Sequence, residues 1–232
     1  MSDLKYITVS GHDMFYGMIT YNDIKIDNGV YYWHYYVPCS ANAYSPKARA
    51  FRNLMLDYKG RDTNDWKLGA GYKIRNYELF ACEIFNALRD LAIEKGYKKL
   101  ALIAVPKSTV KKPNGLELSI KVIADIYHQS FKNKAMKDQF LQDVQFYDYS
   151  KMLIRTTDIP SMHKAGHYSV PYQTMYDSIS CTKELEPSNK MFVIIDDILT
   201  TGQTLQVCED ILKDHGADPE HIIKVAIAKT IH

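Results

Sequence analysis

The sequence is poor in the features that mark secreted, zinc-binding or membrane proteins. Its four cysteines, Cys39, Cys82, Cys181 and Cys208, lie far apart and form no Cys-x-x-Cys pair. This argues against a zinc ribbon or a disulfide framework and suits a reducing compartment. No apolar run approaches the roughly 20 residues that span a bilayer, and the first residues contain no apolar signal region. We therefore expect a soluble cytoplasmic protein without a membrane partner.

Net charge is also small. The 232 residues include 29 Lys and Arg against 27 Asp and Glu, a formal net charge of +2. That balance gives no indication of nucleic-acid binding through bulk charge. The 46% hydrophobic and 24% charged residues are typical of a globular chain, which is long enough to bury a core. Wholly disordered and fibrous proteins are excluded.

The N-terminal part, residues 4–37, is rich in β-branched and aromatic residues. Asn28-Gly29 suits a turn with positive φ, so residues 24–26 and 30–37 are predicted to form an antiparallel hairpin. The aromatic cluster 31–36 has two interpretations. Its rings could stack on nucleic-acid bases, or they could pack within the sheet. The weak net charge favours packing, so nucleic acid is not an expected partner.

The rest of the chain predicts helices and buried strands. Pro46 suits a helix start, and a stripe of apolar residues over 77–92 predicts a helix that ends at Gly96. Further helices are expected around 116–127 and 205–215. Uninterrupted apolar runs at 100–105 and 191–195 predict strands that are covered on both faces, and further strands are expected at 144–149 and 222–228. This pattern indicates an α/β fold with a parallel sheet flanked by helices.

Residues 154–187 have no clean periodicity, which is typical of a functional loop. We expect a β-rich and helical N-terminal appendage or hood over 1–60, followed by an α/β domain over 61–232.

One segment, residues 191–205, is the most informative. A buried strand is expected to end at Asp196 and Asp197, and a loop of threonines with Gly202 leads into a helix. Ligands of open α/β sheets bind at the carboxyl ends of strands, and N–H groups at a helix start bind anions. Carboxylates accept hydrogen bonds from sugar hydroxyls. Each fragment alone is more often structural, but the combination predicts a site for a phosphorylated ribose.

This segment closely resembles the phosphoribosyl pyrophosphate (PRPP) motif of type I phosphoribosyltransferases, which has four apolar residues, two acidic residues and a Thr-Thr-Gly-x-Thr loop. The resemblance implies the type I phosphoribosyltransferase fold. It implies that Asp196 and Asp197 contact the ribose 2′- and 3′-hydroxyls, with Ile198 and Leu199 at the start of the loop. The 5′-phosphate would be held by Thr200, Thr201, Gly202, Gln203 and Thr204.

The resemblance also requires a loop for the pyrophosphate. Lys107, Ser108 and Thr109 follow the strand 100–105 and fit that position, although a plain surface turn would have the same composition. In this family a mobile loop closes over the reaction centre. Residues 155–175 are the candidate, with Arg155 and Lys164 as catalytic residues, and His167 and the pair 111–112 as further cations that could pair with phosphates. Ordinary surface charge is the alternative for each.

A finer similarity links the chain to the ComF-type competence proteins. Residues 51–62 resemble one of their segments, and the order of 155–157 and 161–163 resembles their loop before the final motif. The N-terminal zinc ribbon that is common in those proteins is absent. This departure weakens any inference about DNA uptake.

Together these resemblances imply a transferase that uses PRPP and Mg²⁺ to pass ribose 5-phosphate to a nitrogenous base and releases pyrophosphate. The alternatives are a non-catalytic sensor of PRPP or a nucleotide, and a competence-type protein. The expected partners are PRPP and a small-molecule base, with a homodimer left open and Mg²⁺ held mostly by substrate oxygens and water rather than by a protein metal site.

Overall fold

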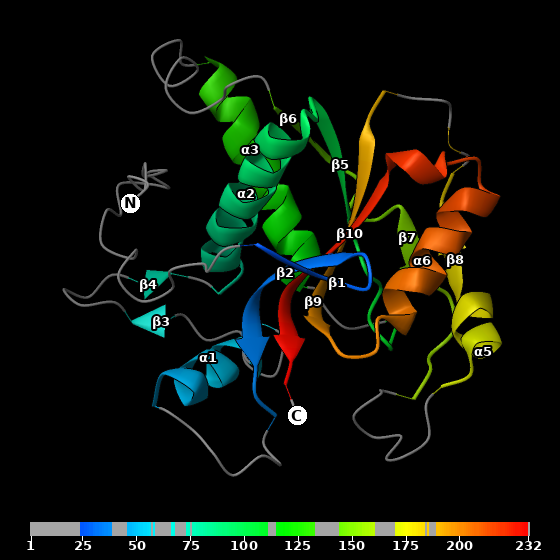
Figure 1. Ribbon diagram of the computed structural model, residues 1–232, viewed down its shortest axis with the longest axis horizontal. Helices are drawn as coiled ribbons and strands as arrows, with labels where there is room; N and C mark the ends of the chain where they lie inside the picture. Colours follow the sequence, from blue (N-terminus) through cyan, green and yellow to red (C-terminus); the bar gives the residue numbers. More distant parts are fainter. Residues whose placement is uncertain are drawn as a thin grey trace.

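A six-stranded, mostly parallel sheet organises the protein, whose structure is a computed structural model (Figure 1). The structure describes residues 24–38, 46–56, 58, 66–67, 73–74, 76–110, 115–132, 144–160, 170–183, 185 and 189–231. The strand order is β1-β2-β10-β9-β5-β6. Its strands are β1 (Lys25–Asp27), β2 (Val30–Tyr36), β5 (Lys99–Ala104), β6 (Gln145–Asp148), β9 (Met191–Leu199) and β10 (Ile222–Thr230).

The remaining elements are helices and two small two-stranded sheets. The helices are α1 (Pro46–Leu56), α2 (Asn76–Lys95), α3 (Gly115–Lys132), α5 (Tyr172–Asp177), α6 (Gln203–Asp214) and the 3₁₀ helix η3 (Pro219–His221). The small sheets pair β3 (Trp66–Lys67) with β4 (Lys73–Ile74), and β7 (Leu153–Arg155) with β8 (Ile179–Cys181).

Two hydrophobic clusters cover the two faces of the sheet. Val193 and Ile195 of β9 pack with residues of α2 and α3. Phe192 and Ile194, which alternate with them, pack with residues of α6 and of the β7–β8 region. Figure 1 shows the same division, with α2 and α3 on one side of the sheet and α5 and α6 on the other. The predicted fold class, a parallel α/β sheet flanked by helices, is confirmed.

The predicted N-terminal hairpin is also confirmed. β1 and β2 pair antiparallel across a turn in which Asn28 has φ 47° and Gly29 has φ 75°. However, β2 also pairs in parallel with β10, so the hairpin is part of the central sheet and not a separate antiparallel layer. In Figure 1 the blue β2 lies directly beside the red β10. The division of the chain at residue 60 stays a prediction.

The aromatic cluster of β2 packs into the protein, as predicted. Tyr32, Trp33 and Tyr36 are buried, whereas Tyr35 is 44% exposed. A row of rings for stacking bases is therefore not presented on this strand.

Three features predicted for the helices, two of them boundaries, agree with the structure. Pro46 opens α1, the apolar stripe of α2 is buried, and Gly96 follows α2 with φ 75°. Residues 154–187 are more regular than expected, because they include the end of β7, all of β8 and α5. In the part of the chain that the structure describes, no helix combines the length and the apolar character needed to cross a membrane.

Candidate functional site

The two acidic residues of the motif lie where strand β5 leaves strand β9. β5 pairs with β9 as far as Ala104 opposite Ile195, and the Val105 N–H donates to the Ile195 carbonyl at 2.9 Å. β10 continues beside β9 to Leu199. Asp196 and Asp197 therefore lie at the carboxyl end of β5, where a crevice for a ligand forms in open α/β sheets.

Asp196 and Asp197 follow one another in a strand, so their side chains point toward opposite faces of the sheet. Burial raises the pKa of the Cys208 thiol on α6, and the charge of Asp196 raises it further. Burial also raises the pKa of the Tyr58 hydroxyl on the other face; a hydrogen bond with Ser119 opposes that rise and the charge of Asp197 adds to it. A ligand that uses both half-buried carboxylates must lie across the end of the sheet.

Ile198 and Leu199 differ from their prediction as loop residues. Both belong to β9, are 6% and 4% exposed, and pair with Ala228 and Lys229 of β10. The strand continues past the acidic pair because β10 still supplies hydrogen-bond partners on one side. The loop begins at Thr200.

The threonine loop, residues 200–204, leads into α6 as predicted. Gly202 is the residue before the helix and has φ 79°, a left-handed conformation that favours glycine. Gly202 has no side chain to cap the helix. The Gln203 N–H donates to Thr201 Oγ1 at 3.4 Å, and N–H groups at a helix start point toward solvent or a ligand. Thr200 and Thr201 are exposed beside them.

Four residues of the loop line a cavity of about 310 Å³, together with Leu199 and residues of the β1–β2 turn, β10, α5 and α6. The four are Thr200, Thr201, Gly202 and Gln203. Asp196 and Asp197 do not line this cavity. Among the described residues, the wall of this cavity thus includes the loop but not the acidic pair.

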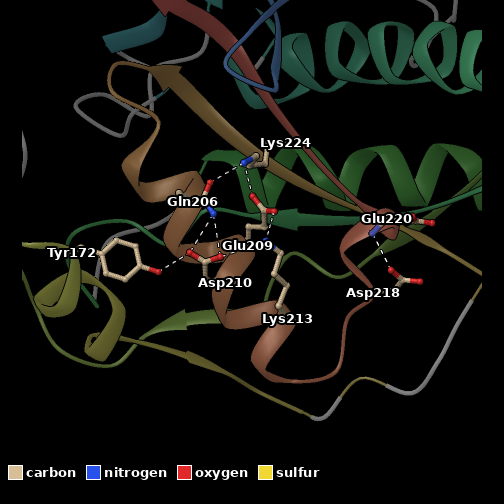
Figure 2. A network of polar contacts seen from close by, with 8 residues as sticks. All are labelled: Tyr172, Gln206, Glu209, Asp210, Lys213, Asp218, Glu220 and Lys224. Carbon is tan, nitrogen blue, oxygen red and sulfur yellow. Dashed lines mark hydrogen bonds and ion pairs between the residues drawn. The ribbon is translucent and has the colours of Figure 1, made fainter.

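Helix α6, which carries the loop at its start, is fixed by a polar network (Figure 2). Lys224 of β10 donates to Gln206 at 3.1 Å and also bonds to Glu209, which pairs with Lys213 at 2.6 Å. Asp210 accepts hydrogen bonds from Tyr172 of α5 at 2.7 Å and from Gln206 at 3.1 Å. The sequence analysis did not find this network. Only the contacts within α6 have a helical spacing that could be read from the sequence.

The predicted pyrophosphate loop, residues 106–109, follows β5 at the same end of the sheet. Lys107, Ser108 and Thr109 are half-buried. The Ile159 N–H donates to the Ser108 carbonyl at 2.9 Å, and Asp158 accepts from the Val110 N–H at 2.7 Å. The segment after β7 therefore packs along this loop.

Arg155 differs from the mobile phosphate-binding residue that the sequence analysis expected. It lies in β7, is 7% exposed, and its Nε donates to the Lys107 carbonyl at 2.8 Å. Burial lowers the pKa of its guanidinium. The side chain is thus bound to the loop that it was expected to assist.

Other predicted cations fall on residues that the structure does not describe. Lys164, His167 and the pair 111–112 lie outside the described residues, as do residues 161–163. Within the described ranges, no cluster of three or more His, Cys, Asp or Glu side chains could hold a metal ion.

The contact between Tyr58 and Ser119 was not predicted from the sequence. The Tyr58 hydroxyl and Ser119 Oγ are 3.0 Å apart, and Ser119 donates to the Tyr77 carbonyl at 2.7 Å. This links the segment after α1 to the starts of α2 and α3, beside Asp197. Tyr58 lies in the 51–62 segment that resembles ComF-type proteins, but that resemblance gives no indication of its hydrogen bond with Ser119.

The segment from α3 to β10 resembles known proteins. Residues 117–230 match the family model of the phosphoribosyl transferase domain. The match covers just under half of the 232 residues and contains the acidic pair and the threonine loop. It supports the type I phosphoribosyltransferase family, and the mostly parallel sheet flanked by helices is consistent with that fold. The 106–109 loop lies outside the matched residues. No curated protein matches the sequence.

Proposed function

We propose that this protein is a phosphoribosyltransferase, which transfers ribose 5-phosphate from PRPP to a nitrogenous base and releases pyrophosphate. One observation carries the proposal. The acidic pair lies in β9 just where its pairing with the parallel strand β5 ends, and the 106–109 loop follows β5; the Val105 N–H is hydrogen-bonded to the carbonyl just before Asp196. The family match supports phosphoribosyl transfer in general.

The proposed roles follow from the chemistry of each group. Asp196 and Asp197 accept hydrogen bonds from the ribose hydroxyls, because carboxylates are acceptors and repel phosphate. The threonine loop binds the 5′-phosphate through its N–H and hydroxyl groups at the positive end of α6. Gly202 allows a phosphate to approach the loop closely, because it has no side chain and its left-handed backbone turns the chain into the helix.

The 106–109 loop is assigned to the pyrophosphate. When the bond to C1′ breaks, negative charge grows on the leaving pyrophosphate and positive charge grows on the ribose ring. Lys107 and the N–H groups of Ser108 and Thr109 would stabilise the leaving group electrostatically. Lys107 is half-buried, so water screens its charge less than at an open surface.

Magnesium fits this site only together with the substrate. Mg²⁺ prefers oxygen ligands and keeps several waters, and within the described residues no group of three carboxylates could hold it alone. Asp196 and Asp197 could contribute carboxylate oxygens, directly or through water, to an ion that the substrate holds. When bound, the ion would neutralise part of the charge of the diphosphate.

The finer assignments are also proposals. The similarity of residues 51–62 and 155–163 to ComF-type proteins supports placement in that branch. A small-molecule base as the acceptor, a cytoplasmic location and a homodimer would be consistent with it.

Calorimetry with PRPP and Mg²⁺ tests the proposal. The double variant D196N/D197N should abolish binding, because neutral amides replace the charged carboxylates that accept hydrogen bonds from the ribose hydroxyls. D177N is the matched control, since Asp177 lies on α5 and binds Gln173. Unchanged affinity in the double variant would refute the assignment.

Turnover separates transfer from binding. Pyrophosphate release should appear when the wild-type protein is given PRPP, Mg²⁺ and a panel of nitrogenous bases. A sensor protein would bind PRPP without release for any base.

A further inference from the structure

We infer that Arg155 is a positioning residue, which holds the 106–109 loop so that its N–H groups point toward the pyrophosphate. The inference rests on the proposed function. It assigns Arg155 a role through the loop, in place of direct contact with a phosphate.

The contacts of Arg155 show how it holds the loop. Its Nε donates to the Lys107 carbonyl at 2.8 Å, and one terminal nitrogen reaches the Pro106 carbonyl at 3.4 Å. The other terminal nitrogen donates to Ser178 Oγ, which itself donates to the Met175 carbonyl at 2.7 Å. The guanidinium is thereby fixed between the loop and the end of α5.

Peptide geometry converts these contacts into a direction for the N–H groups. In a trans peptide the carbonyl of one residue and the N–H of the next point in opposite directions. Because the carbonyls of Pro106 and Lys107 point toward Arg155, the N–H groups of Lys107 and Ser108 point away from it. The Ser108 carbonyl accepts from the Ile159 N–H at 2.9 Å, so the N–H of Thr109 points away from that segment as well.

Two of these donors remain available for a ligand. Within the described residues, the N–H groups of Ser108 and Thr109 donate no hydrogen bond, whereas that of Val110 donates to Asp158. Thr109 Oγ1 is buried and also has no hydrogen-bond partner in the described part of the chain. Successive N–H groups that face one way form a concavity that binds anions.

The positive charge of Arg155 also favours anion binding at this loop. The residue is 7% exposed, and among the described residues no carboxylate forms an ion pair with it. Its hydrogen-bond acceptors are neutral oxygens. The charge of Asp158 acts on Arg155 and offsets part of its charge. A buried cation without an ion pair still strengthens the positive potential in front of the loop, where a diphosphate carries its charge.

The experiment compares three ligands by calorimetry: PRPP, inorganic pyrophosphate and ribose 5-phosphate, each with Mg²⁺. In R155M we expect binding of PRPP and pyrophosphate to weaken by about tenfold or more, because charge-assisted hydrogen bonds to the loop are lost. Ribose 5-phosphate lacks the diphosphate, so its affinity should stay within about twofold. R89M is the matched control, since Arg89 lies on α2 and pairs with Asp90.

The variant S178A distinguishes a positioning role of Arg155 from direct contact between Arg155 and phosphate. It also provides a test if R155M does not fold. It keeps the arginine charge but removes the anchor of the guanidinium. Positioning predicts weaker pyrophosphate binding with unchanged ribose 5-phosphate binding. A guanidinium that binds phosphate itself would be released by S178A, and pyrophosphate binding would then be unchanged or tighter; this result overturns the inference.

The measurements distinguish failure of this inference from failure of the proposed function. If the wild-type protein binds PRPP and both variants bind pyrophosphate as tightly as it does, the positioning role is wrong and the proposed function stands. If the wild-type protein binds neither PRPP nor pyrophosphate, both fall.

Discussion

The side-chain amide of Gln203 donates a hydrogen bond to the main-chain carbonyl of Val170, over 3.1 Å. Gln203 occupies the variable position of the Thr-Thr-Gly-x-Thr loop and is the first residue of α6. Val170 is buried and lies two residues before α5. The contact ties the start of α6 to the segment that leads into α5.

Removal of this contact should lower stability. We expect Q203M to reduce the free energy of unfolding in urea by about 1 kcal/mol, the net contribution of a typical hydrogen bond. Q173M is the control, because Gln173 is exposed and its amide binds Asp177 within α5. Equal urea midpoints for Q203M and the wild-type protein would contradict the prediction.

Replacement of Gly202 should lower the stability of the protein when the new side chain disfavours positive φ. Its φ is 79°, and a Cβ atom would meet Leu199 Cδ1 at 3.4 Å. We expect G202A to cost about 1–2 kcal/mol of stability, as estimated for left-handed backbone with a side chain. G202N should cost less, because asparagine tolerates this conformation. Urea unfolding of both variants measures the difference, and an equal cost for the two would argue against backbone strain.

Gly115 is needed for close packing at the start of α3. A Cβ atom there would lie 2.6 Å from the Tyr58 carbonyl oxygen, which is shorter than van der Waals contact. We expect G115A to destabilise the protein by about 1–3 kcal/mol through overpacking. The helix propensity of alanine returns at most about 1 kcal/mol.

The control for G115A is L118A, on an exposed position of the same helix. Its effect should stay within about 0.5 kcal/mol, as for most surface substitutions. Thermal melts of the two variants compare the sites directly. A G115A protein as stable as the wild type would show that the Tyr58 segment can move away.

Glu209 should contribute to stability in acid. Burial raises the pKa of its carboxyl, but hydrogen bonds and charges from Lys213 and Lys224 outweigh burial and hold the pKa below its ordinary value of 4.5. The folded state therefore binds this proton more weakly than the unfolded state. The contribution is present above pH 4.5 and is lost as the pH falls through the lower, folded-state pKa.

Thermal melts at a series of pH values test this sign. E209Q should lose less stability than the wild-type protein on acidification below about pH 5, because its side chain cannot bind the proton. E94Q is the control at an exposed glutamate of α2. Parallel pH profiles for E209Q and the wild-type protein would be the contrary result.

His34 of β2 and Glu83 of α2 form a buried pair behind the hairpin. H34L should destabilise the protein by about 3–5 kcal/mol, because it leaves a buried carboxyl without its partner. The double variant H34L/E83L should be more stable than H34L alone, since no buried charge then remains unpaired. Chemical denaturation of the three proteins checks the order, and a double variant less stable than H34L would reverse the argument.

Local patterns were sufficient to predict much of the fold. Continuous apolar runs predicted β5 and the start of β9, Asn28-Gly29 predicted the hairpin, and Gly96 predicted the end of α2. The neighbour of the hairpin was not predictable, because a turn signal says nothing about which strand pairs with β2. The end of β9 was misplaced for a related reason: the charges of Asp196 and Asp197 interrupt the apolar run, while β10 alone continues the pairing.

The site was predictable to the extent that it depends on consecutive residues. The motif around Asp196 and the threonine loop could be recognised because strand, loop and helix follow one another. The sequence analysis predicted Arg155 as a catalytic residue, but it could not predict that the acceptors of its side chain include the main-chain carbonyls of Pro106 and Lys107. The direction of a main-chain carbonyl cannot be read from the identity of the side chains.

The pairing of β2 with β10 bears on how the chain reaches its native state. Val30 lies opposite Lys224, and β10 separates β2 from the rest of the sheet. The hairpin therefore emerges from the ribosome long before the strand that will hold it. Until then its edge is open to strands of other molecules, and pairing of such distant segments is slow. Folding of this sheet is expected to depend on protection of the hairpin during synthesis.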